Sequence, residues 1–514
     1  MLDAVIVGAG HNGLVCAAYL AKAGQNVLVV ERSAQVGGAC VTQELVPGFR
    51  FSTFAYGAHG PGPRICRDLE IPAEAFSVKC LDPGLVQLFP DGDRIVLWAD
   101  PGRLEAELER FGRAEVEGYR RYRRWCARAD AICGDFFLTR PPTPAELRRK
   151  WSEPEDAKVL EVLLGGSLWD LISPCFTHEK VRLAFARADD AGPANQPGSA
   201  LAEFVENAST GLGVQNQAGL LERGMGEITE VLAQRVRAYG GAIRLDAPVR
   251  RVLLGGGRAV GVELESGEML AARRVVSNAD PKRTFLKLLG PGSLSPSFVQ
   301  AVADIKTRAS YAKFLAALSR PPAYQALRPE ERRDARMAAA VRIVPSLPTM
   351  EACWADAQQG RLPRSPIMSC HLPSAYWPSQ APAGKHCFSA WLRWVPSKFA
   401  DGSTWEDNRP TFTARLLEIL ENYAPGFAAS VEWCRLLTPA DIERETGITD
   451  ASIRHVDMTL DQMLDRRPLP AWSSYQTPVP GLWLCGSGTH PGGSVTGGPG
   501  HNCAAAILAD GVRR

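Results

Sequence analysis

The stretch Ala4-Val5-Ile6-Val7-Gly8-Ala9-Gly10-His11-Asn12-Gly13 decides how the chain begins to fold. Residues 4–7 form a short apolar run, which is typical of a buried strand. Gly24 stands where a helix would end, and a second apolar run over residues 27–30 closes on Glu31. The apolar residues at helical spacing between them are Leu14, Ala17, Ala18 and Ala21. The sequence therefore predicts strand, glycine turn, helix and strand over residues 4–31.

Each conspicuous residue of this unit has a physical role. Gly8 permits the tight turn out of the strand, Gly10 lets the backbone approach a pyrophosphate, and Gly13 lets the helix pack closely on the sheet. Free N–H groups and the helix dipole then hold the anion. Glu31 stands where it would accept hydrogen bonds from ribose hydroxyls. The pattern predicts a dinucleotide-binding site.

The glycine motif alone does not separate FAD from NAD, but the following residues narrow the choice. Glu31-Arg32 is followed by Gly37-Gly38-Ala39, which suits a dinucleotide whose far half continues deeper into the protein. This opening resembles the flavoprotein class that includes disulfide reductases, amine oxidases and phytoene desaturases. Disulfide reductases carry two cysteines five residues apart after the double glycine. Here Cys40 is followed at that distance by Leu45, so no internal redox disulfide can form. We interpret Cys40 as a small buried residue, with a catalytic thiol as the alternative.

A second glycine-rich segment lies near the C-terminus. Residues 481–486 indicate a strand, residues 487–500 a loop with little side-chain bulk, and residues 501–508 an alanine-rich helix. Such a loop brings N–H groups close to a flat ligand, and the helix N-terminus adds positive potential. Beneath a flavin this would stabilise negative charge on the reduced ring. The cofactor contacts expected in this segment are Gly486, Gly488, Gly493, Val495 and Thr496.

Residues 484–493, Leu-Cys-Gly-Ser-Gly-Thr-His-Pro-Gly-Gly, resemble the C-terminal flavin motif of bacterial-type phytoene desaturases and their relatives, above all the subgroup called pyridine nucleotide-disulfide oxidoreductase domain-containing protein 2. The resemblance covers nearly the whole chain and includes residues 224–229, 275–281, 438–443, 467–468 and 475–478. It implies that Ser277 and Asn278 lie at the cofactor and that the Val249 backbone contacts the adenine side. Ser494 departs from the pattern, where a third glycine is usual, and so does the stretch 450–452. Both lie near the expected substrate end, so the resemblance leaves the substrate open.

The expected fold is α/β, with a Rossmann-like FAD-binding domain of the glutathione reductase/amine oxidase type and an α+β substrate domain, discontinuous in sequence. Residues 1–70, 218–290 and 475–514 are assigned to the FAD domain. Residues 71–217 and 291–474 are assigned to the substrate domain, whose helical part spans about residues 100–210. The glycines at 211–213 and 255–257 lack the following helix and distal carboxylate of a second dinucleotide site. A stable NAD(P)H site is therefore not expected.

Three histidines fall in segments expected near the flavin: His59, His455 and His490, with His490 the favoured candidate. Tyr475 is a fourth candidate for catalysis. Flavin hydride chemistry often needs no protein acid or base, so a structural role is an equal alternative for each histidine. The sequence shows no metal-ligand spacing and no serine-hydrolase motif, and no metal is expected.

Composition excludes several classes. The 514 residues carry 58 Lys+Arg against 56 Asp+Glu, a formal net charge of +2, which excludes a globally basic nucleic-acid binder. The 13 cysteines are irregularly spaced without a CxxC pair, so we expect reduced thiols and a cytoplasmic protein. No apolar run approaches a membrane span. The segment 105–128 has five arginines between 120 and 128, which fits a solvated helix face better than a membrane-surface helix, although a loose peripheral membrane contact stays open.

Together these features predict an FAD-dependent oxidoreductase, a dehydrogenase/desaturase or oxidase, that removes hydride from a largely apolar organic substrate to form C=C or C=N. An amine-oxidase-like enzyme and a carotenoid-type isomerase are the alternatives within enzymes, and a non-catalytic FAD-stabilised interaction protein is the alternative outside them. The expected electron acceptor is oxygen, a quinone or another protein, and no nucleic-acid partner is expected. The sequence gives no indication of oligomeric state.

Overall fold

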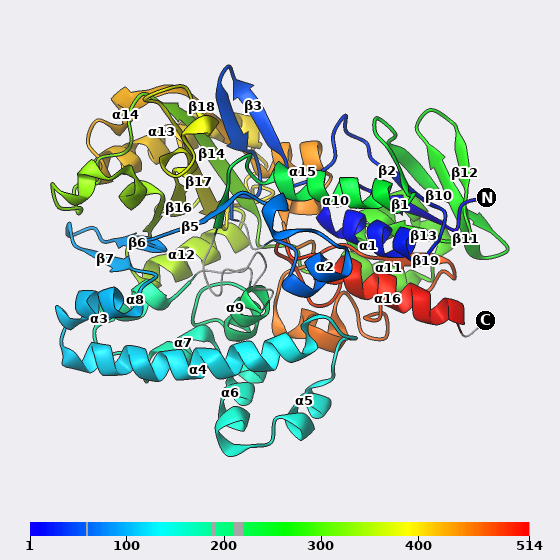
Figure 1. The fold of residues 1–514 in the computed structure, drawn as a ribbon, viewed down its shortest axis with the longest axis horizontal. Helices are drawn as coiled ribbons and strands as arrows, with labels where there is room; N and C mark the ends of the chain where they lie inside the picture. Colours follow the sequence, from blue (N-terminus) through cyan, green and yellow to red (C-terminus); the bar gives the residue numbers. More distant parts are fainter. Residues whose placement is uncertain (58–59, 188–190, 209–218, 513–514) are drawn as a thin grey trace.

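The computed structural model describes residues 1–57, 60–187, 191–208 and 219–512. Figure 1 shows two sheet-containing regions beside one another, with a group of helices, among them the long α4, along the lower edge. Both chain ends lie in the same region. The first and last segments of the chain therefore build one half of the molecule together.

The region that holds both termini is built on a five-stranded parallel sheet. Its order is β19 (Leu482–Leu484), β13 (Val275–Ser277), β1 (Ala4–Val7), β2 (Val27–Val30) and β9 (Ala242–Arg244). The register is continuous, with Val5 opposite Val275 on one side and Leu28 on the other. Parallel strands present their carboxyl ends at one edge. The turns after β1, β2, β13 and β19 therefore meet there.

Side chains of the central strands alternate between two buried faces. Ala4 and Ile6 pack under α1 (His11–Lys22), α10 (Gly226–Ala238) and α16 (Gly498–Val512). Val5 and Val7 pack toward a three-stranded antiparallel sheet and a π-helix, η2 (Arg283–Leu289). That sheet consists of β10 (Val249–Gly255), β11 (Arg258–Leu264) and β12 (Met269–Ala271). This arrangement confirms the predicted Rossmann-like fold class.

The second region is a seven-stranded mixed sheet in which only β15 and β6 pair in parallel. Its order is β18 (Val431–Leu437), β14 (Tyr311–Leu318), β17 (His386–Arg393), β16 (Ile367–His371), β15 (Ala340–Ile343), β6 (Leu85–Leu88) and β7 (Arg94–Leu97). One face, with Phe314 and Phe388, is apolar and packs under α13 (Trp405–Tyr423). The opposite face carries polar side chains and is described with the site.

The helical part contains α3 (Pro101–Glu109), α4 (Arg113–Phe137), α5 (Pro144–Lys150), α6 (Pro154–Gly165), α7 (Leu168–Ile172), α8 (Glu179–Phe185) and α9 (Ser199–Asn207). The segment 105–128, expected from its sequence to be one helix, is in fact two, because Gly112 has φ +119° and interrupts the helical path. The block 71–217 is also less helical than expected at its start, where β5 (Val78–Cys80), β6 and β7 precede α3.

The remaining elements connect the two regions. They are β3 (Thr42–Val46), β4 (Phe49–Ser52), β8 (Gly219–Leu221), α2 (Pro63–Asp68), α11 (Pro296–Ala303), α12 (Leu347–Gln358), α14 (Phe427–Ser430) and α15 (Pro439–Thr446). β3 and β4 form a hairpin directly after the double glycine.

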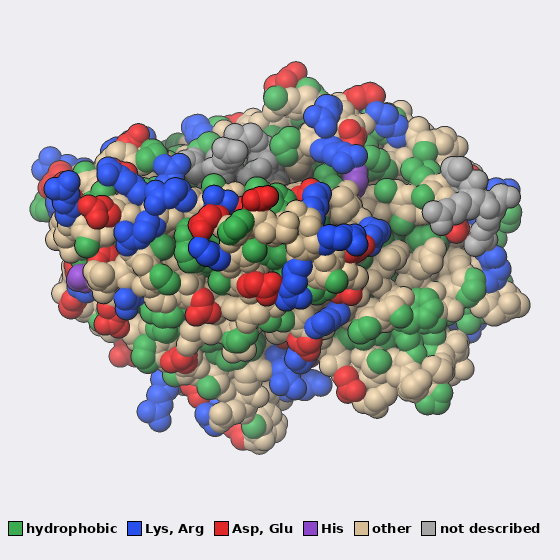
Figure 2. Space-filling model, turned by 90° about the horizontal axis from the view of Figure 1, so that it is seen from below, with side chains coloured by type: hydrophobic (Ala, Val, Ile, Leu, Met, Phe, Trp, Pro, Cys, Tyr) green, Lys and Arg blue, Asp and Glu red, His purple; other side chains and the backbone are tan. Residues whose placement is uncertain are grey.

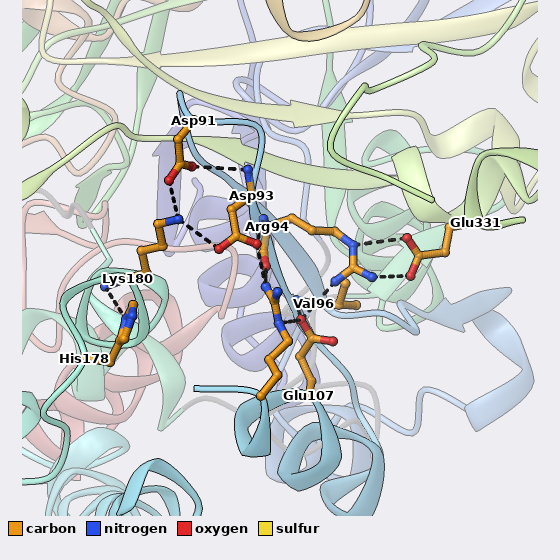
Figure 3. A network of polar contacts seen from close by, with 9 residues as sticks. Asp91, Asp93, Arg94, Val96, Glu107, His178, Lys180 and Glu331 are labelled. Atoms are coloured by element: carbon orange, nitrogen blue, oxygen red, sulfur yellow. Dashed lines mark hydrogen bonds and ion pairs between the residues drawn. The ribbon is translucent and has the colours of Figure 1, made fainter. Parts of the chain in front are cut away.

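A network of charged residues joins the helical part to the mixed sheet (Figure 3). Arg94 of β7 is buried and pairs with Glu107 of α3 at 2.9 Å and with Glu331. Lys180 of α8 pairs with Asp93 at 2.9 Å. Each charge in the network faces an opposite one, so we interpret it as structural.

The arginines of α4 are partly neutralised by neighbouring acids. Arg120 pairs with Glu105, and Arg128 pairs with Asp156. Figure 2 shows Lys/Arg and Asp/Glu side chains interspersed on the face seen from below. This mixture is typical of a solvated surface. In the part of the chain that the structure describes, no helix has the length and apolar character needed to cross a bilayer.

Candidate functional site

The turn after β1 leaves room for backbone only. A Cβ placed on Gly13 would lie 2.3 Å from the Gly8 carbonyl oxygen, so α1 packs against the turn as only glycine permits. A Cβ on Gly10 would lie 2.7 Å from the Asn278 side-chain nitrogen. Gly10 also forms an isolated β-bridge with Gly37 of the double glycine. Three segments far apart in sequence therefore meet around one glycine turn.

Glu31 is buried and fixes this turn at the end of β2. Its carboxylate accepts hydrogen bonds from the Ala9 N–H at 2.8 Å and the Ser33 N–H at 2.9 Å. Each carboxylate oxygen keeps acceptor capacity for further donors, such as ribose hydroxyls. The start of α1 is capped by Gly10 without a side-chain bond and has no acidic residue in its first turn. These features fit the pyrophosphate and ribose of a dinucleotide.

The C-terminal glycine loop lies against the N-terminal turn. The Asn12 side-chain amide donates to the Ser487 hydroxyl at 3.2 Å, and the His11 ring Nε2 lies 3.1 Å from the Ser494 carbonyl oxygen. A Cβ on Gly486 would lie 2.7 Å from the Asn278 carbonyl oxygen. Ser494 has φ +72°, the conformation that favours the glycine usual at this position. The two glycine segments thus form one continuous cradle.

Arg467 holds the glycine loop from behind and is completely buried. Its guanidinium donates to the carbonyl of Ser487 at 2.8 Å and to that of Thr489 at 3.3 Å. It also donates to the carbonyls of Arg454 and Val456. Sequence reasoning identified Arg467 only as part of a family match and missed this role. The residue fixes the loop through its backbone carbonyls.

The predicted catalytic residues lie at different depths. The His490 ring Nε2 lies 3.1 Å from the Phe136 carbonyl oxygen of α4, and the Tyr475 hydroxyl donates to the His490 carbonyl at 3.0 Å. Both side chains are buried in this packing. His455 has a buried ring Nδ1 with no hydrogen-bond partner among the described residues, 3.1 Å from a Cβ placed on Gly486. His59 lies outside the described residues.

Burial keeps these histidines neutral. It lowers the pKa of His455 to about 3 and that of His490 to about 4, with the positive charge of Arg467 adding to both shifts. Burial and His455 lower the pKa of His11 to about 4. At neutral pH none of the three rings carries a proton to donate as an imidazolium.

The other predicted cofactor residues are distributed along the cradle. Gly37 and Gly38 have positive φ, and Ala39 follows them. Val249 begins β10 beside Ala247, whose N–H bonds the Glu31 carbonyl. The remaining contacts are as follows: Ser277 Oγ bonds Thr284 Oγ1, Gly488 faces Pro281, Gly493 faces Arg454, Thr496 accepts from the Gly498 N–H, and Val495 packs on the α1 side. Arg32 points away, because its guanidinium donates to the carbonyls of Arg444 and Glu445 on the surface.

A buried lysine that sequence reasoning missed lies on the polar face of the mixed sheet. Lys313 Nζ donates to the carbonyls of Ser52 at 2.5 Å, Phe54 at 3.0 Å and Ala55 at 3.3 Å. Burial lowers its pKa to about 7. The ammonium lies 5.9 Å over the Tyr56 ring. It therefore ties β14 to the segment that follows the double glycine.

Aromatic rings surround this lysine. The Tyr56 ring lies 4.0 Å from that of His371 and 5.7 Å from that of Trp391. A narrow cavity of about 20 Å³ lies next to these rings. Its polar lining includes Arg50, Ser52, Tyr56, His371, Gln380 and Ser389. The cradle and this aromatic floor are linked through the chain from Cys40 to Tyr56.

The model of the family described as flavin containing amine oxidoreductase matches residues 13–393. The chain belongs to this family. This flavin-containing amine oxidoreductase is 31% identical to the mouse pyridine nucleotide-disulfide oxidoreductase domain-containing protein 2, over 99% of this chain and 93% of that protein. It is 27% identical to a limonene dehydrogenase chain of Castellaniella defragrans, over 99% and 93% of the two chains. It is 24% identical to the lycopene-forming phytoene desaturase of Pseudescherichia vulneris, over 97% and 96%.

Solved structures of the same fold include a variant of putrescine oxidase, with a TM-score of 0.61, 16% identity and coverage of 100% of this chain and 99% of that one. An oxidoreductase from Methanosarcina mazei gives a TM-score of 0.60 at 17% identity, over 98% and 99% of the two chains. Family membership makes the protein an oxidoreductase and supports FAD as its cofactor. The relatives also confirm the predicted kinship with phytoene desaturases.

The flavin-containing amine oxidoreductase has neither a disulfide nor a metal cluster in the described part of its chain. All thirteen cysteines are free thiols. Cys40 is buried beside the His11 ring, with Sγ 3.8 Å from Nδ1, and burial raises its pKa to about 12. A thiol of that pKa is a poor nucleophile, which favours the interpretation of Cys40 as a packing residue. No group of three or more His, Cys, Asp or Glu side chains among the described residues could hold a metal ion.

Proposed function

We propose that the chain binds FAD along the glycine cradle and oxidises an organic substrate beside the aromatic floor around Lys313. The observation that carries the proposal is the meeting of the Gly8–Gly13 turn, Glu31 and the 486–496 loop at one edge of the parallel sheet. Glu31 would hold the ribose and the start of α1 the pyrophosphate. When bound there, FAD supplies the hydride acceptor.

The protein's own residues position the reaction. The loop 486–496 would cover one side of the flavin ring, and Lys313, Tyr56 and Trp391 would wall the substrate side and exclude water. A lysine whose pKa lies near 7 can hold or release a proton at Nζ near neutral pH. The described rings of His11, His455 and His490 stay neutral, so they act by position rather than by charge.

Dehydrogenation at carbon is the reaction that the relatives support best. Their names include a limonene dehydrogenase and phytoene desaturases. Putrescine oxidase shares the fold, and oxidation at a carbon–nitrogen bond stays the second candidate. We propose oxygen, a quinone or another protein as the acceptor of the electrons.

Purified protein is expected to be yellow and to release FAD rather than FMN on denaturation. The reason is that Glu31 and the α1 N-terminus contact the adenosine and pyrophosphate halves, which FMN lacks. Chromatography of the released flavin checks this. Stoichiometric FMN, or no flavin after reconstitution with FAD, would remove the proposal.

NADH and NADPH are expected to bleach the flavin slowly or not at all under anaerobic conditions. The Gly255–Gly257 turn joins two strands of a hairpin and is not followed by a helix, so it cannot bind a second dinucleotide; Gly211–Gly213 lies outside the described residues. Stopped-flow absorbance of the flavin band is the measurement. Rapid, saturable bleaching by NADPH would contradict the absence of a nicotinamide site.

A further inference from the structure

The polar face of the mixed sheet carries a row of side chains fixed by strand register. Lys313 lies opposite Trp391, Trp391 opposite Ser369, Ser369 opposite Arg342, and Arg342 opposite Gln87. Because side chains alternate along a strand, all five project from the same face. All five are buried. Polar groups therefore cross five strands on a face that is closed to bulk solvent.

Two of these groups are cations whose partners are neutral. The Arg342 guanidinium donates to Gln87 Oε1 at 2.6 Å and to the carbonyls of Leu183 at 2.9 Å and Ala184 at 2.7 Å. The three acceptors of Lys313 are also carbonyl oxygens. Neither cation has a carboxylate partner among the described residues. Buried charges are normally paired, so an anion bound against this face would be stabilised.

The narrow cavity opens on the same face. His371 lies two residues beyond Ser369 on β16 and opposite Ser389 of β17, and both line the cavity. The diagonal spacing puts the Arg342 and His371 side chains roughly 7–8 Å apart at their bases. Arg50 of β4 lines the cavity from the other side. No aspartate or glutamate is among the described residues that line it.

His371 adds an unsatisfied polar atom to this wall. Its Nδ1 is buried and has no hydrogen-bond partner within the described parts of the chain. Burial and the charges of Lys313 and Arg393 lower its pKa to about 3, so its ring remains neutral. A cavity of about 20 Å³ admits a group of about the size of one water molecule. It suits the small polar head of a ligand, not its apolar body.

We infer that the substrate carries an anionic head group, a carboxylate, which lies toward Arg342 and Arg50 while its apolar body lies along the aromatic floor. The inference rests on the proposed function and names the substrate class for that site. A protonated amine would be repelled by the same cations, and a pure hydrocarbon would leave them without a counter-charge. The substrate is therefore an amphipathic acid rather than a polyene or a polyamine.

Three aromatic probes of nearly equal size test the charge preference on the FAD-loaded protein: benzoate, benzamide and benzylamine. Binding is read from the change in the flavin absorption band during titration. Benzoate is expected to bind at least about tenfold more tightly than benzamide, the difference expected for a hydrogen bond to a charged group. Benzylamine is expected to bind more weakly than both.

Two variants locate the charge. Arg50→Gln and Arg342→Gln are each expected to weaken benzoate binding about tenfold while leaving benzamide binding unchanged. Arg50→Lys is expected to restore most of the loss. Arg237→Gln, an exposed arginine of α10 in the other region, makes the same charge change away from the cavity and is the matched control. FAD content shows that each variant remains folded.

Benzamide binding as tightly as benzoate, benzylamine binding more tightly than either, or unchanged benzoate affinity in both glutamine variants would each overturn the inference. So would the absence of benzoate binding at millimolar concentration to protein that contains its full FAD. Failure of the proposed function has a different signature, because then the protein would retain no FAD in the first place.

Discussion

Gly10→Val protein is expected to purify colourless while remaining folded. The new side chain would start 2.7 Å from the Asn278 amide nitrogen and would fill the space where the backbone approaches the pyrophosphate. Strand β1 and helix α1 keep their own hydrogen bonds, so the effect falls on the cofactor. We expect at least about a hundredfold loss of FAD affinity, because a steric block at the phosphate removes several hydrogen bonds together.

The measurement is the ratio of flavin to protein absorbance after reconstitution, with circular dichroism to check the fold. Gly134→Ala is the control, because this glycine lies within α4 and a Cβ there meets nothing within 4 Å. That substitution should leave FAD occupancy unchanged. Normal FAD occupancy in Gly10→Val would show that the cofactor lies elsewhere.

The glycine cradle could be predicted from sequence because its geometry is local. A turn that needs Gly8 at φ +100° and a Gly13 without a Cβ can be filled by few other residues, so the pattern survives in the sequence itself. The same holds for residues 484–500. The helix break at Gly112 was missed because glycine inside a long polar pattern does not by itself show whether the helix continues.

The aromatic and cationic floor could not be predicted in this way. Lys313 lies in β14, where all eight residues are buried, and a lysine in such a run gives no signal of which atoms it contacts. Its carbonyl partners Ser52 and Phe54 precede it by more than 250 residues. Arg342 likewise depends on carbonyls of α8, far away in sequence. Contacts between distant segments follow from the topology, which one sequence does not reveal.

Acid is expected to destabilise the folded protein through His490. Its ring Nε2 is bonded to the Phe136 carbonyl, so a second proton would have to go on the buried Nδ1, which has no partner among the described residues. Burial lowers its pKa to about 4 in the folded state, while an unfolded histidine titrates near 6.5. Between these values the unfolded chain binds more protons than the folded one, so stability falls as pH falls through this window.

The shift corresponds to about 3 kcal/mol of unfolding free energy lost between pH 7 and pH 4. Other groups titrate in the same range, so the test compares variants: urea unfolding at both pH values for the wild type and His490→Gln, which should lose about 3 kcal/mol less on acidification. His386→Gln is the comparison, since His386 on β17 is only half-buried and solvent screens its charge. An equal acid loss in wild type and His490→Gln would mean that the imidazole is protonated without cost, and that its buried nitrogen reaches water in solution.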